Sequence, residues 1–273
     1  MNLELNKYLP REDLRPYIRF YYTVSIKEGQ MDLLLDNHPQ GTVDLMLMLE
    51  GQVGFSAGVN EESVLKKLIL IGQQEQKFSF RFLPHIRLLG VTFTAEGFGK
   101  IFRFPVNELT NTGMVGVDLL HREDRYLLER VAEMRNDRAR ILLLNDIFAR
   151  KIYELDIPFD GVDGTIQALR NSGGQLSIKE LADAYNMSTR TLQRKFAAKI
   201  GVSPKTFARI ARFNYMLRLL KQQPKTDWMD LLYRSGYYDQ MHFIKEFKQF
   251  TGVTPSKYLD INHDLRDFFL GEE

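Results

Sequence analysis

LSIKELADAYNMSTRTLQRKFAAKIGVSP, residues 176–204, decides the fold of this chain, because a later stretch repeats it. Residues 235–255 read SGYYDQMHFIKEFKQFTGVTP and match the first stretch at an offset of 51 positions. The matched pairs are Ser188 with Asp239, Leu192 with Phe243, Phe196 with Phe247, Gly201–Pro204 with Gly252–Pro255, and Phe207 with Tyr258. Self-similarity at a fixed offset indicates two copies of one structural unit.

The first copy is predicted to fold as two helices joined by a tight turn. Ser177 can cap the first helix, and Glu180, three residues on, completes a capping box. Asn186 tolerates the left-handed backbone that a tight turn requires, and Ser188 then caps a second helix over residues 189–200. Two helices joined in this way form the helix-turn-helix arrangement that reads DNA.

The second copy begins near Trp228, turns at residues 236–238 and restarts at the cap Asp239, so its turn is one residue longer. Between the copies, Pro204 suits the first turn of a long helix of roughly 18 residues. At about 1.5 Å per residue this helix spans roughly 27 Å, close to one DNA turn of about 34 Å. It is therefore long enough to hold the second helices of the two units in successive major grooves of DNA. It is equally suited to be a core helix. The predicted helix-turn-helix units lie at about residues 178–200 and 228–250.

Polar side chains are expected on the outward faces of both second helices. In the first unit Leu192 and Phe196 face inward, which at 100° per residue leaves the opposite face to polar residues. Arg can donate two hydrogen bonds to guanine, and Gln can pair with adenine in the major groove. The expected base contacts are Arg190, Gln193 and Arg194 in the first unit and Gln240, Met241, His242 and Lys245 in the second. The expected phosphate contacts are Ser188, Thr189, Thr191, Lys195 and Asp239.

An exposed Arg-x-x-Gln-Arg pattern is in most proteins simply a solvated helix face. Its place after a capped turn, inside a basic repeat, is what favours DNA here. Residues 165–259 hold 16 Lys and Arg against six Asp and Glu, whereas the rest of the chain holds 21 against 29. A basic segment attached to an acidic one indicates a polyanionic partner for the first, double-stranded DNA in this case.

The first half of the chain is predicted to be a small β-barrel or sandwich followed by helices. The stretches rich in aromatic and branched residues, and therefore the expected strands, are residues 17–26, 42–49, 65–71, 77–82 and 86–94. Apolar residues three and four apart predict helices over 126–134 and 141–155. DIPFDGVDG, residues 156–164, is the expected linker. The sequence thus predicts a two-domain α+β chain, with a regulatory domain at 1–155 and an all-α DNA-binding domain at 165–262.

Two features of this half each admit two interpretations. The aromatic residues either line an effector cavity in the barrel or simply form its core, and the core is favoured; they are Tyr21, Tyr22, Phe55, Phe80 and Phe93. An apolar stripe on the last helix either pairs with a second subunit or packs inside the domain, and internal packing is favoured; it consists of Ile141, Leu144, Ile147 and Phe148.

Composition argues against an enzyme. The chain has no cysteine, so it has no disulfide, no thiolate nucleophile and no cysteine-bound zinc, and a reducing cytoplasm is the expected compartment. Phosphate-binding glycine loops, GxSxG and HExxH motifs are all missing from the sequence, and the histidines are scattered, so we expect no cofactor, no metal and no catalytic residue. The start, Met1–Pro10, is polar, and no apolar run approaches the roughly 18 residues of a membrane span. Two rivals stay open: an enzyme domain carrying a DNA-targeting module, and an architectural protein that binds DNA without preference.

Residues 165–260 resemble the DNA-binding domain of the AraC/XylS family of bacterial transcription regulators. The resemblance rests on LSIKELADAYNMSTRTLQRKFAAKIGVSPKTF, RFNYMLRLL and SGYYDQMHFIKEFKQFTGVTPSKY, which ends on the Gly-x-x-Pro-x-x-Tyr of that family. It implies that the seven expected base contacts stand where the family touches bases. Met216 and Leu232 depart from the usual alanine and Tyr237 from the usual phenylalanine, and these bulky residues put the spacing of the two units in question.

The amino-terminal half resembles the regulatory domains of that family more loosely, through LRPYIRFYYTV and GVTFTAEGFGKIFRFPVNELT. The resemblance implies a domain that binds a small-molecule effector, forms a homodimer, or does both. It also implies RNA polymerase as a partner if the protein is an activator.

Overall fold

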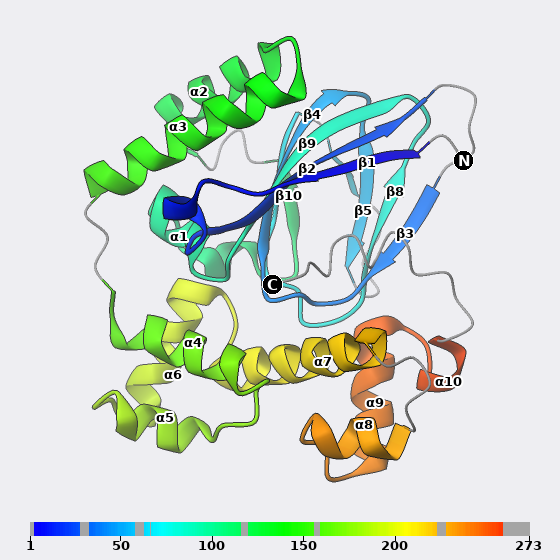
Figure 1. The fold of residues 1–273 in the computed structure, drawn as a ribbon, viewed down its shortest axis with the longest axis vertical. Helices are drawn as coiled ribbons and strands as arrows, with labels where there is room; N and C mark the ends of the chain where they lie inside the picture. Colours follow the sequence, from blue (N-terminus) through cyan, green and yellow to red (C-terminus); the bar gives the residue numbers. More distant parts are fainter. Residues whose placement is uncertain are drawn as a thin grey trace.

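The computed structural model describes residues 3–27, 33–57, 63–65, 67–115, 120–155, 159–222 and 228–258. It shows the predicted two-domain α+β fold, with antiparallel sheets and covering helices first and an all-helical part after them (Figure 1).

Two antiparallel sheets form the amino-terminal sandwich. The six-stranded sheet has the order β1-β2-β9-β4-β7-β10, and the four-stranded sheet has the order β3-β8-β5-β6. The bounds are β1 Leu3–Tyr8, β2 Ile18–Ile26, β3 Leu33–Asn37, β4 Val43–Glu50, β5 Val53–Ala57, β6 Ser63–Leu65, β7 Leu68–Ile71, β8 Phe78–Phe82, β9 Ile86–Phe93 and β10 Gly113–Val115. The central strands β2 and β9 are rich in branched and aromatic residues and almost wholly buried, which is why the sequence pattern identifies them.

The expected single strand at residues 65–71 is wrong. β6 ends at Leu65 in the four-stranded sheet, whereas β7 starts at Leu68 in the six-stranded sheet. Between them Lys67 has a φ of 62°, a left-handed conformation that interrupts an extended chain. The chain therefore crosses from one sheet to the other inside what looks like one apolar run.

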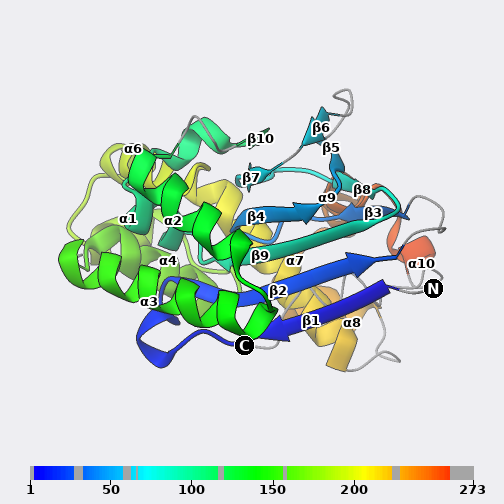
Figure 2. The ribbon, with the colours of Figure 1, turned by 90° about the horizontal axis from the view of Figure 1, so that it is seen from above.

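Helices cover the outer face of the six-stranded sheet (Figure 2). They are α1 Gly97–Phe102, the short 3-10 helix η2 Val106–Leu109, α2 Arg122–Glu133 and α3 Asp137–Leu155, and a 3-10 turn, η1, lies at Glu12–Leu14. The predicted stripe on α3 is buried in the same cluster as Tyr21, Val91 and Phe93 of the sheet. The stripe therefore packs inside the domain, which is the interpretation that the sequence favours.

The helical part begins earlier than expected. α4 Gly161–Asn171 takes in the second half of the expected linker, because Asp160 caps it in a capping box. The Asp160 carboxylate accepts from the amides of Val162 and Asp163, and the Asp163 carboxylate accepts from the amide of Asp160. The aspartates that favour a loop in the sequence thus begin a helix. Residues 156–158 of the expected linker lie outside the described residues.

The remaining helices are α5 Ile178–Ala184, α6 Thr189–Ile200, α7 Pro204–Gln222, α8 Trp228–Arg234, α9 Gln240–Thr251 and α10 Pro255–Tyr258. They enclose two small cores, one around α4, α5 and α6 and the other around α8, α9 and α10. The long helix α7 contributes to both, with Phe207 in the first and Phe213 in the second. α7 is thus a core helix and a connector at once (Figure 1).

Candidate nucleic-acid interface

Two 12-residue helices, α6 and α9, start 51 positions apart and end 51 positions apart. Each starts on a side-chain cap: Ser188 Oγ accepts from the amide of Thr191 at 3.1 Å, and Asp239 Oδ1 accepts from that of Met241 at 2.8 Å. Each ends on a glycine in the left-handed region, Gly201 with φ 92° and Gly252 with φ 80°. The sequence repeat is therefore a structural repeat.

The turns before these helices differ in the way the sequence predicts. In the first unit four residues separate α5, which ends at Ala184, from α6, which starts at Thr189. Asn186 among them takes the left-handed step, with φ 51°. In the second unit five residues separate α8 from α9, and Gly236 takes that step with φ 77°. Each unit is a helix, a tight turn and a second helix.

The inward face of each second helix is fully buried. Leu192 and Phe196 of α6 have no solvent exposure, and Phe243 and Phe247 of α9 are exposed by 2% and 0%. The opposite face is therefore fixed toward solvent.

All seven expected base contacts are exposed on those opposite faces. They are Arg190, Gln193 and Arg194 on α6, and Gln240, Met241, His242 and Lys245 on α9. The expected phosphate contacts lie at the starts of the same helices, where Ser188, Thr189, Lys195 and Asp239 are exposed and Thr191 is half-buried. The side-chain oxygens of Ser188 and Asp239 already accept hydrogen bonds as helix caps. These residues can therefore donate to a phosphate through their backbone N–H groups and, at Ser188, through the hydroxyl proton.

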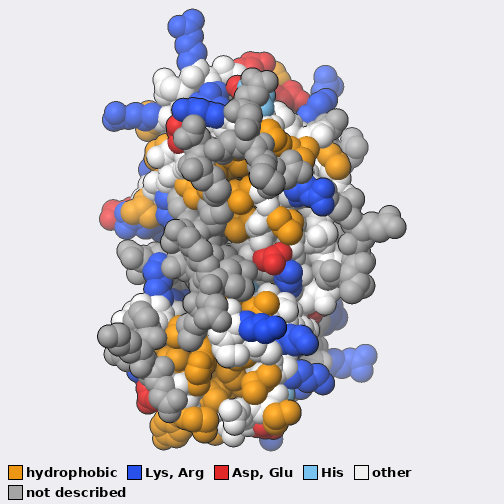
Figure 3. Space-filling view, turned by 90° about the vertical axis from the view of Figure 1, so that its right-hand side faces the viewer, with side chains coloured by type: hydrophobic (Ala, Val, Ile, Leu, Met, Phe, Trp, Pro, Cys, Tyr) orange, Lys and Arg blue, Asp and Glu red, His pale blue; other side chains and the backbone are white. Residues whose placement is uncertain are grey.

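The second unit adds apolar side chains to its exposed surface. Hydrophobic side chains gather at the end of the molecule that holds α8 and α9, next to Lys and Arg side chains (Figure 3). The large exposed ones are Met229, Tyr233, Tyr238 and Met241. This surface is less polar than that of the first unit.

A buried network that the sequence did not predict fastens α9 to α7. The Tyr237 hydroxyl donates to Glu246 Oε1 at 2.5 Å, and Arg209 Nε donates to Glu246 Oε2 at 2.6 Å. Glu246 is 2% exposed, and burial together with this carboxylate raises the pKa of Tyr237. Tyr237 is one of the departures from the family pattern. Its hydroxyl gives the buried Glu246 carboxylate a second hydrogen-bond partner beside Arg209.

The other two departures fill the same core. Met216 of α7 and Leu232 of α8 are 0% and 4% exposed, and both belong to the cluster around α9. Side chains larger than alanine are therefore accommodated within the second unit.

Residues 181–261 match the helix-turn-helix domain family, and residues 6–114 match a family described as a domain of unknown function, DUF6597. The carboxyl-terminal part of this chain is a helix-turn-helix domain of the AraC type.

Two curated relatives are similar to part of this chain. One is the HTH-type transcriptional regulator MtrA of Neisseria gonorrhoeae, 32% identical over 82 residues that cover 30% of this chain and 27% of the relative. The other is an uncharacterized HTH-type transcriptional regulator of Haemophilus influenzae, 31% identical over 93 residues that cover 34% of this chain and 31% of the relative. The chain thus matches less than a third of the length of either.

Solved structures are similar over different lengths. ToxT from Vibrio cholerae is 15% identical, with 95% of this chain and 98% of ToxT covered and a TM-score of 0.46. The carboxyl-terminal domain of AraT, a response regulator from Geobacillus stearothermophilus, is 24% identical, with 38% and 89% covered and a TM-score of 0.34.

The AraC-type domain rests on the sandwich at the carboxyl end of each second helix. Beside α6, Thr110 Oγ1 donates to the Gly201 carbonyl at 2.6 Å, and Lys100 Nζ of α1 lies 2.8 Å from Asp163 of α4. At the end of α9, the Lys77 amide donates to the Gln249 carbonyl at 3.1 Å. These contacts leave the exposed faces of α6 and α9 free of the sandwich.

The five aromatic candidates for an effector cavity are all buried, but they do not surround one space. Tyr22, Phe55 and Phe80 lie between the two sheets, whereas Tyr21 and Phe93 lie on the other face, under the helices. The five residues therefore line no common cavity and belong to the cores, which is the interpretation that the sequence favours. The space between the sheets next to Tyr22 and Phe80 is about 30 Å³, which is the volume of about one water.

None of the helices in the ranges given above is long and apolar enough to cross a membrane. Within those same ranges, no three His, Asp or Glu side chains come together as metal ligands.

Proposed function

We propose that this chain is a sequence-specific DNA-binding regulator of transcription, and that α6 and α9 read two successive segments of the major groove. The observation that carries the proposal is the pair of second helices in register, each with a buried apolar face and an exposed polar face. The net positive charge of residues 165–259 supports a polyanionic partner.

The helix α7 supports the spacing of the two readers. Its 19 residues at about 1.5 Å each give a length of roughly 28 Å, which is close to the pitch of B-DNA at about 34 Å. Because α7 contributes to both small cores, it acts as a rigid spacer between the two units.

The two readers offer different chemistry. In the first unit, Arg190 and Arg194 are suited to guanine and Gln193 to adenine. In the second unit, Lys245 is suited to guanine or phosphate and Met241 to a thymine methyl. The first unit therefore contributes most of the base specificity.

Phosphate contacts then fix the position of each reader on the duplex. Thr189 and Asp239, at the starts of α6 and α9, are exposed, so backbone N–H groups there that the caps leave unused can donate to phosphates, and exposed Lys195 adds a positive charge on α6. These contacts carry affinity, which falls with added salt, and little sequence information.

The amino-terminal domain is the proposed controlling part, acting through a small effector, through dimerisation, or through both. α3 turns Leu142 and Tyr153 toward solvent, exposed by 58% and 88%, and a second copy of the chain would cover them. As an activator, the protein would also contact RNA polymerase.

Selection of bound sequences from a random duplex pool, with competitor DNA and at stated salt, tests this function. We expect a motif of two blocks with centres about 10 bp apart, one for each reader. An unselective binder, as an architectural protein would be, yields no motif and contradicts the proposal. The rival hypothesis, an enzyme domain with a DNA-targeting module, predicts that the amino-terminal half catalyses a reaction. Activity assays with that half alone would detect such a reaction.

A further inference from the structure

Two segments of the sandwich lie side by side where β7 and β10 pair. They are residues 72–77, which follow β7, and residues 106–112, which precede β10, and together they are called the strip. The amide of Asn111 donates to the Gln73 carbonyl at 2.8 Å. The strip thus continues the contact between the two strands beyond the end of their ladder.

One part of the strip contacts the carboxyl end of α6. Thr110 Oγ1 donates to the carbonyl of Gly201, the glycine that ends this helix, at 2.6 Å. The fit is close, because a Cβ at Gly201 would lie 2.8 Å from that hydroxyl and 3.1 Å from the Val106 carbonyl oxygen. The first reader is therefore attached to the sandwich at its last residues.

The other part of the strip contacts the carboxyl end of α9. The amide of Lys77 donates to the Gln249 carbonyl at 3.1 Å, and Gln249 Nε2 donates to the Glu75 carbonyl at 3.4 Å. A Cβ at Gly252 would lie 2.7 Å from Cδ of Lys77. Since Gly201 and Gly252 end the two helices 51 positions apart, the strip meets both repeats at the equivalent place.

Asn111 and Glu75 join the two parts of the strip. The Glu75 amide donates to Asn111 Oδ1 at 2.9 Å, and Asn111 Nδ2 donates to Glu75 Oε2 at 2.9 Å. Asn111 directly follows Thr110, which bonds the end of α6, and the Glu75 carbonyl accepts from Gln249 of α9. A path of hydrogen bonds and one peptide unit therefore links the ends of α6 and α9 without passing through α7.

This junction has a fixed geometry. Asn111 has a φ of 57°, a left-handed conformation that asparagine adopts more readily than most residues. Asn111 and Glu75 are both half-buried, and the bond to the carboxylate is charge-assisted, which makes it stronger than a bond between neutral groups. On α9, Gln249 Oε1 also accepts from Arg209 Nη2 at 2.9 Å, so the junction is connected to the buried network behind that helix.

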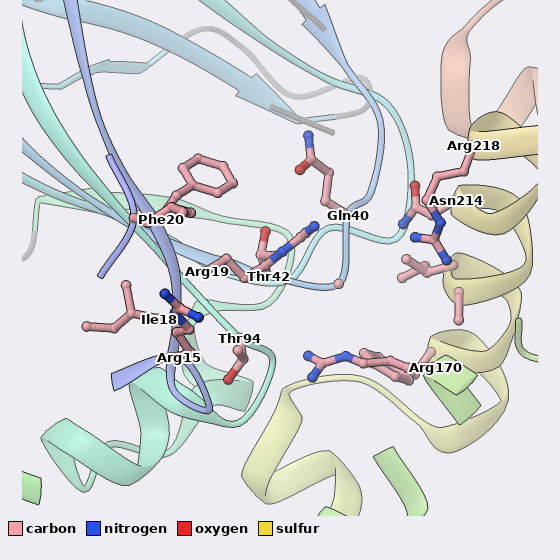
Figure 4. A pocket seen from close by; sticks show the side chains of 15 residues that line it. Arg15, Ile18, Arg19, Phe20, Gln40, Thr42, Thr94, Arg170, Asn214 and Arg218 are labelled. Carbon is pink, nitrogen blue, oxygen red and sulfur yellow. The ribbon is translucent and has the colours of Figure 1, made fainter. Parts of the chain in front are cut away.

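Beside α7 the two domains pack less closely. A cavity of about 420 Å³ lies there, with Thr42 and Thr94 on the sandwich side and Arg170 and Asn214 on the helical side (Figure 4). One direct contact in this region is the bond from Asn214 Nδ2 to the Pro39 carbonyl, at 3.2 Å. Because the cavity interrupts the packing along α7, the strip carries a larger share of the connection between the sandwich and the two readers.

We propose that the strip sets the position of α6 and α9 relative to each other, and that Asn111 and Glu75 are its positioning residues. The strip contacts the carboxyl ends of both helices and leaves free their amino-terminal residues, which touch base edges in helix-turn-helix proteins. Two readers that are already held at one spacing lose less conformational freedom when they bind DNA. The strip thus favours one spacing of the two DNA blocks over others. This effect on DNA rests on the proposed function, whereas the fixed position of the helices does not.

Spin-label distances between the two helices of the full chain test the positioning without DNA. The chain has no cysteine, so K195C on α6 and K245C on α9 provide two exposed labelling sites away from the strip. This doubly labelled chain should give one narrow distance distribution. Adding N111G, which removes the junction's side chain and keeps a residue suited to a positive φ, should broaden that distribution.

A second variant and a control complete this measurement. T110V removes the hydroxyl that donates to Gly201, keeps a side chain of the same shape, and should also broaden the distribution. N136G removes an exposed asparagine that bonds the amide of Ala139, away from both readers, and should leave the distribution narrow. The proposal is overturned if N111G and T110V keep the narrow distribution, or if N136G broadens it as much as they do.

Titration of labelled duplexes tests the consequence for DNA. One duplex carries the selected motif, and the other has one extra base pair between the blocks, which turns the second block by about 35°. The chain without substitutions should bind the wider duplex about tenfold more weakly, which corresponds to the loss of one base contact. N111G should bind the selected duplex more weakly than the parent chain and separate the two duplexes by about threefold or less, whereas N136G should keep the tenfold ratio.

Two results of this titration contradict the proposal. One is the same ratio of affinities in N111G and the parent chain. The other is a rise in the affinity of N111G for the selected duplex, because it would mean that the strip holds α6 and α9 in an arrangement that DNA does not accept.

The two measurements separate the strip from the proposed function. A chain whose distances broaden in N111G and that selects no DNA motif keeps the positioning role and loses the function. A chain that selects a motif, with the same distances in N111G and the parent chain, does the reverse.

Discussion

Arg194 stands on the exposed face of α6, one turn after Arg190, with Phe196 buried behind it. R194A should cost about 1 to 3 kcal/mol of binding free energy on the preferred duplex and relax base preference at one position. Titrations of labelled duplex, preferred and random, measure both effects, and R135A is the control at an exposed arginine away from α6. An equal loss on random duplex would make Arg194 a phosphate contact instead.

Tyr237 tests the network behind α9. Y237F removes the hydroxyl that donates to buried Glu246, and a hydrogen bond to a charged group contributes about 1.5 to 3 kcal/mol. The free energy of unfolding in urea should fall by that amount. Y238F, at a tyrosine that is 93% exposed, should leave it unchanged. Equal stability of Y237F and the parent chain would show that the hydroxyl adds nothing.

Asp44 makes the stability of the sandwich depend on pH. Burial raises its pKa from 3.8 to about 6, against the hydrogen bond from Thr92 and the charge of Arg19. The folded state thus holds this proton more tightly than the unfolded state, so stability is lost as pH rises from about 4 through 6, by about 3 kcal/mol. D44N should remove this loss, and urea unfolding from pH 4 to 7 would measure it. The same pH slope in D44N and the parent chain contradicts this assignment.

At the scale of single residues, the sequence was sufficient where periodicity sets a direction. Leu192 and Phe196 pack inward and Arg190 and Arg194 face solvent, because 100° per residue decides both. The Tyr237–Glu246–Arg209 network escaped prediction, since these residues come from three segments and only packing brings them together. Which of the two cores Phe93 joins escapes prediction for a similar reason, because which face of a strand is covered by helices depends on the rest of the fold.

The helices α6 and α9 depend on their caps. S188A removes the acceptor for the amide of Thr191, and loss of such a cap costs about 1 kcal/mol. T189A, at the exposed first residue of the same helix, serves as the matched control. Urea unfolding should separate the two variants by about that amount, and indistinguishable stabilities would mean that the cap is not used.

At the scale of elements, helices with caps and amphipathic periodicity were predictable and several strands were not. α6, α7 and α9 have the expected bounds within a residue or so because Ser188, Pro204 and Asp239 mark their starts. β1 and β3 were missed because they pair on one side only, at sheet edges, and keep just part of their side chains buried. The start of α4 falls in the expected linker because aspartates are common both in loops and at helix starts.

The central claim is that the two helices of one chain read one duplex together. Its most direct test is to insert 5 bp between the two blocks of the selected motif, which turns the second block to the other face of the DNA. We predict that affinity falls to that of a duplex holding the first block alone, and that K245A no longer weakens binding to the insertion duplex. Unchanged affinity after the insertion would contradict the claim, because it would mean that α6 and α9 do not contact the same stretch of DNA at a fixed spacing.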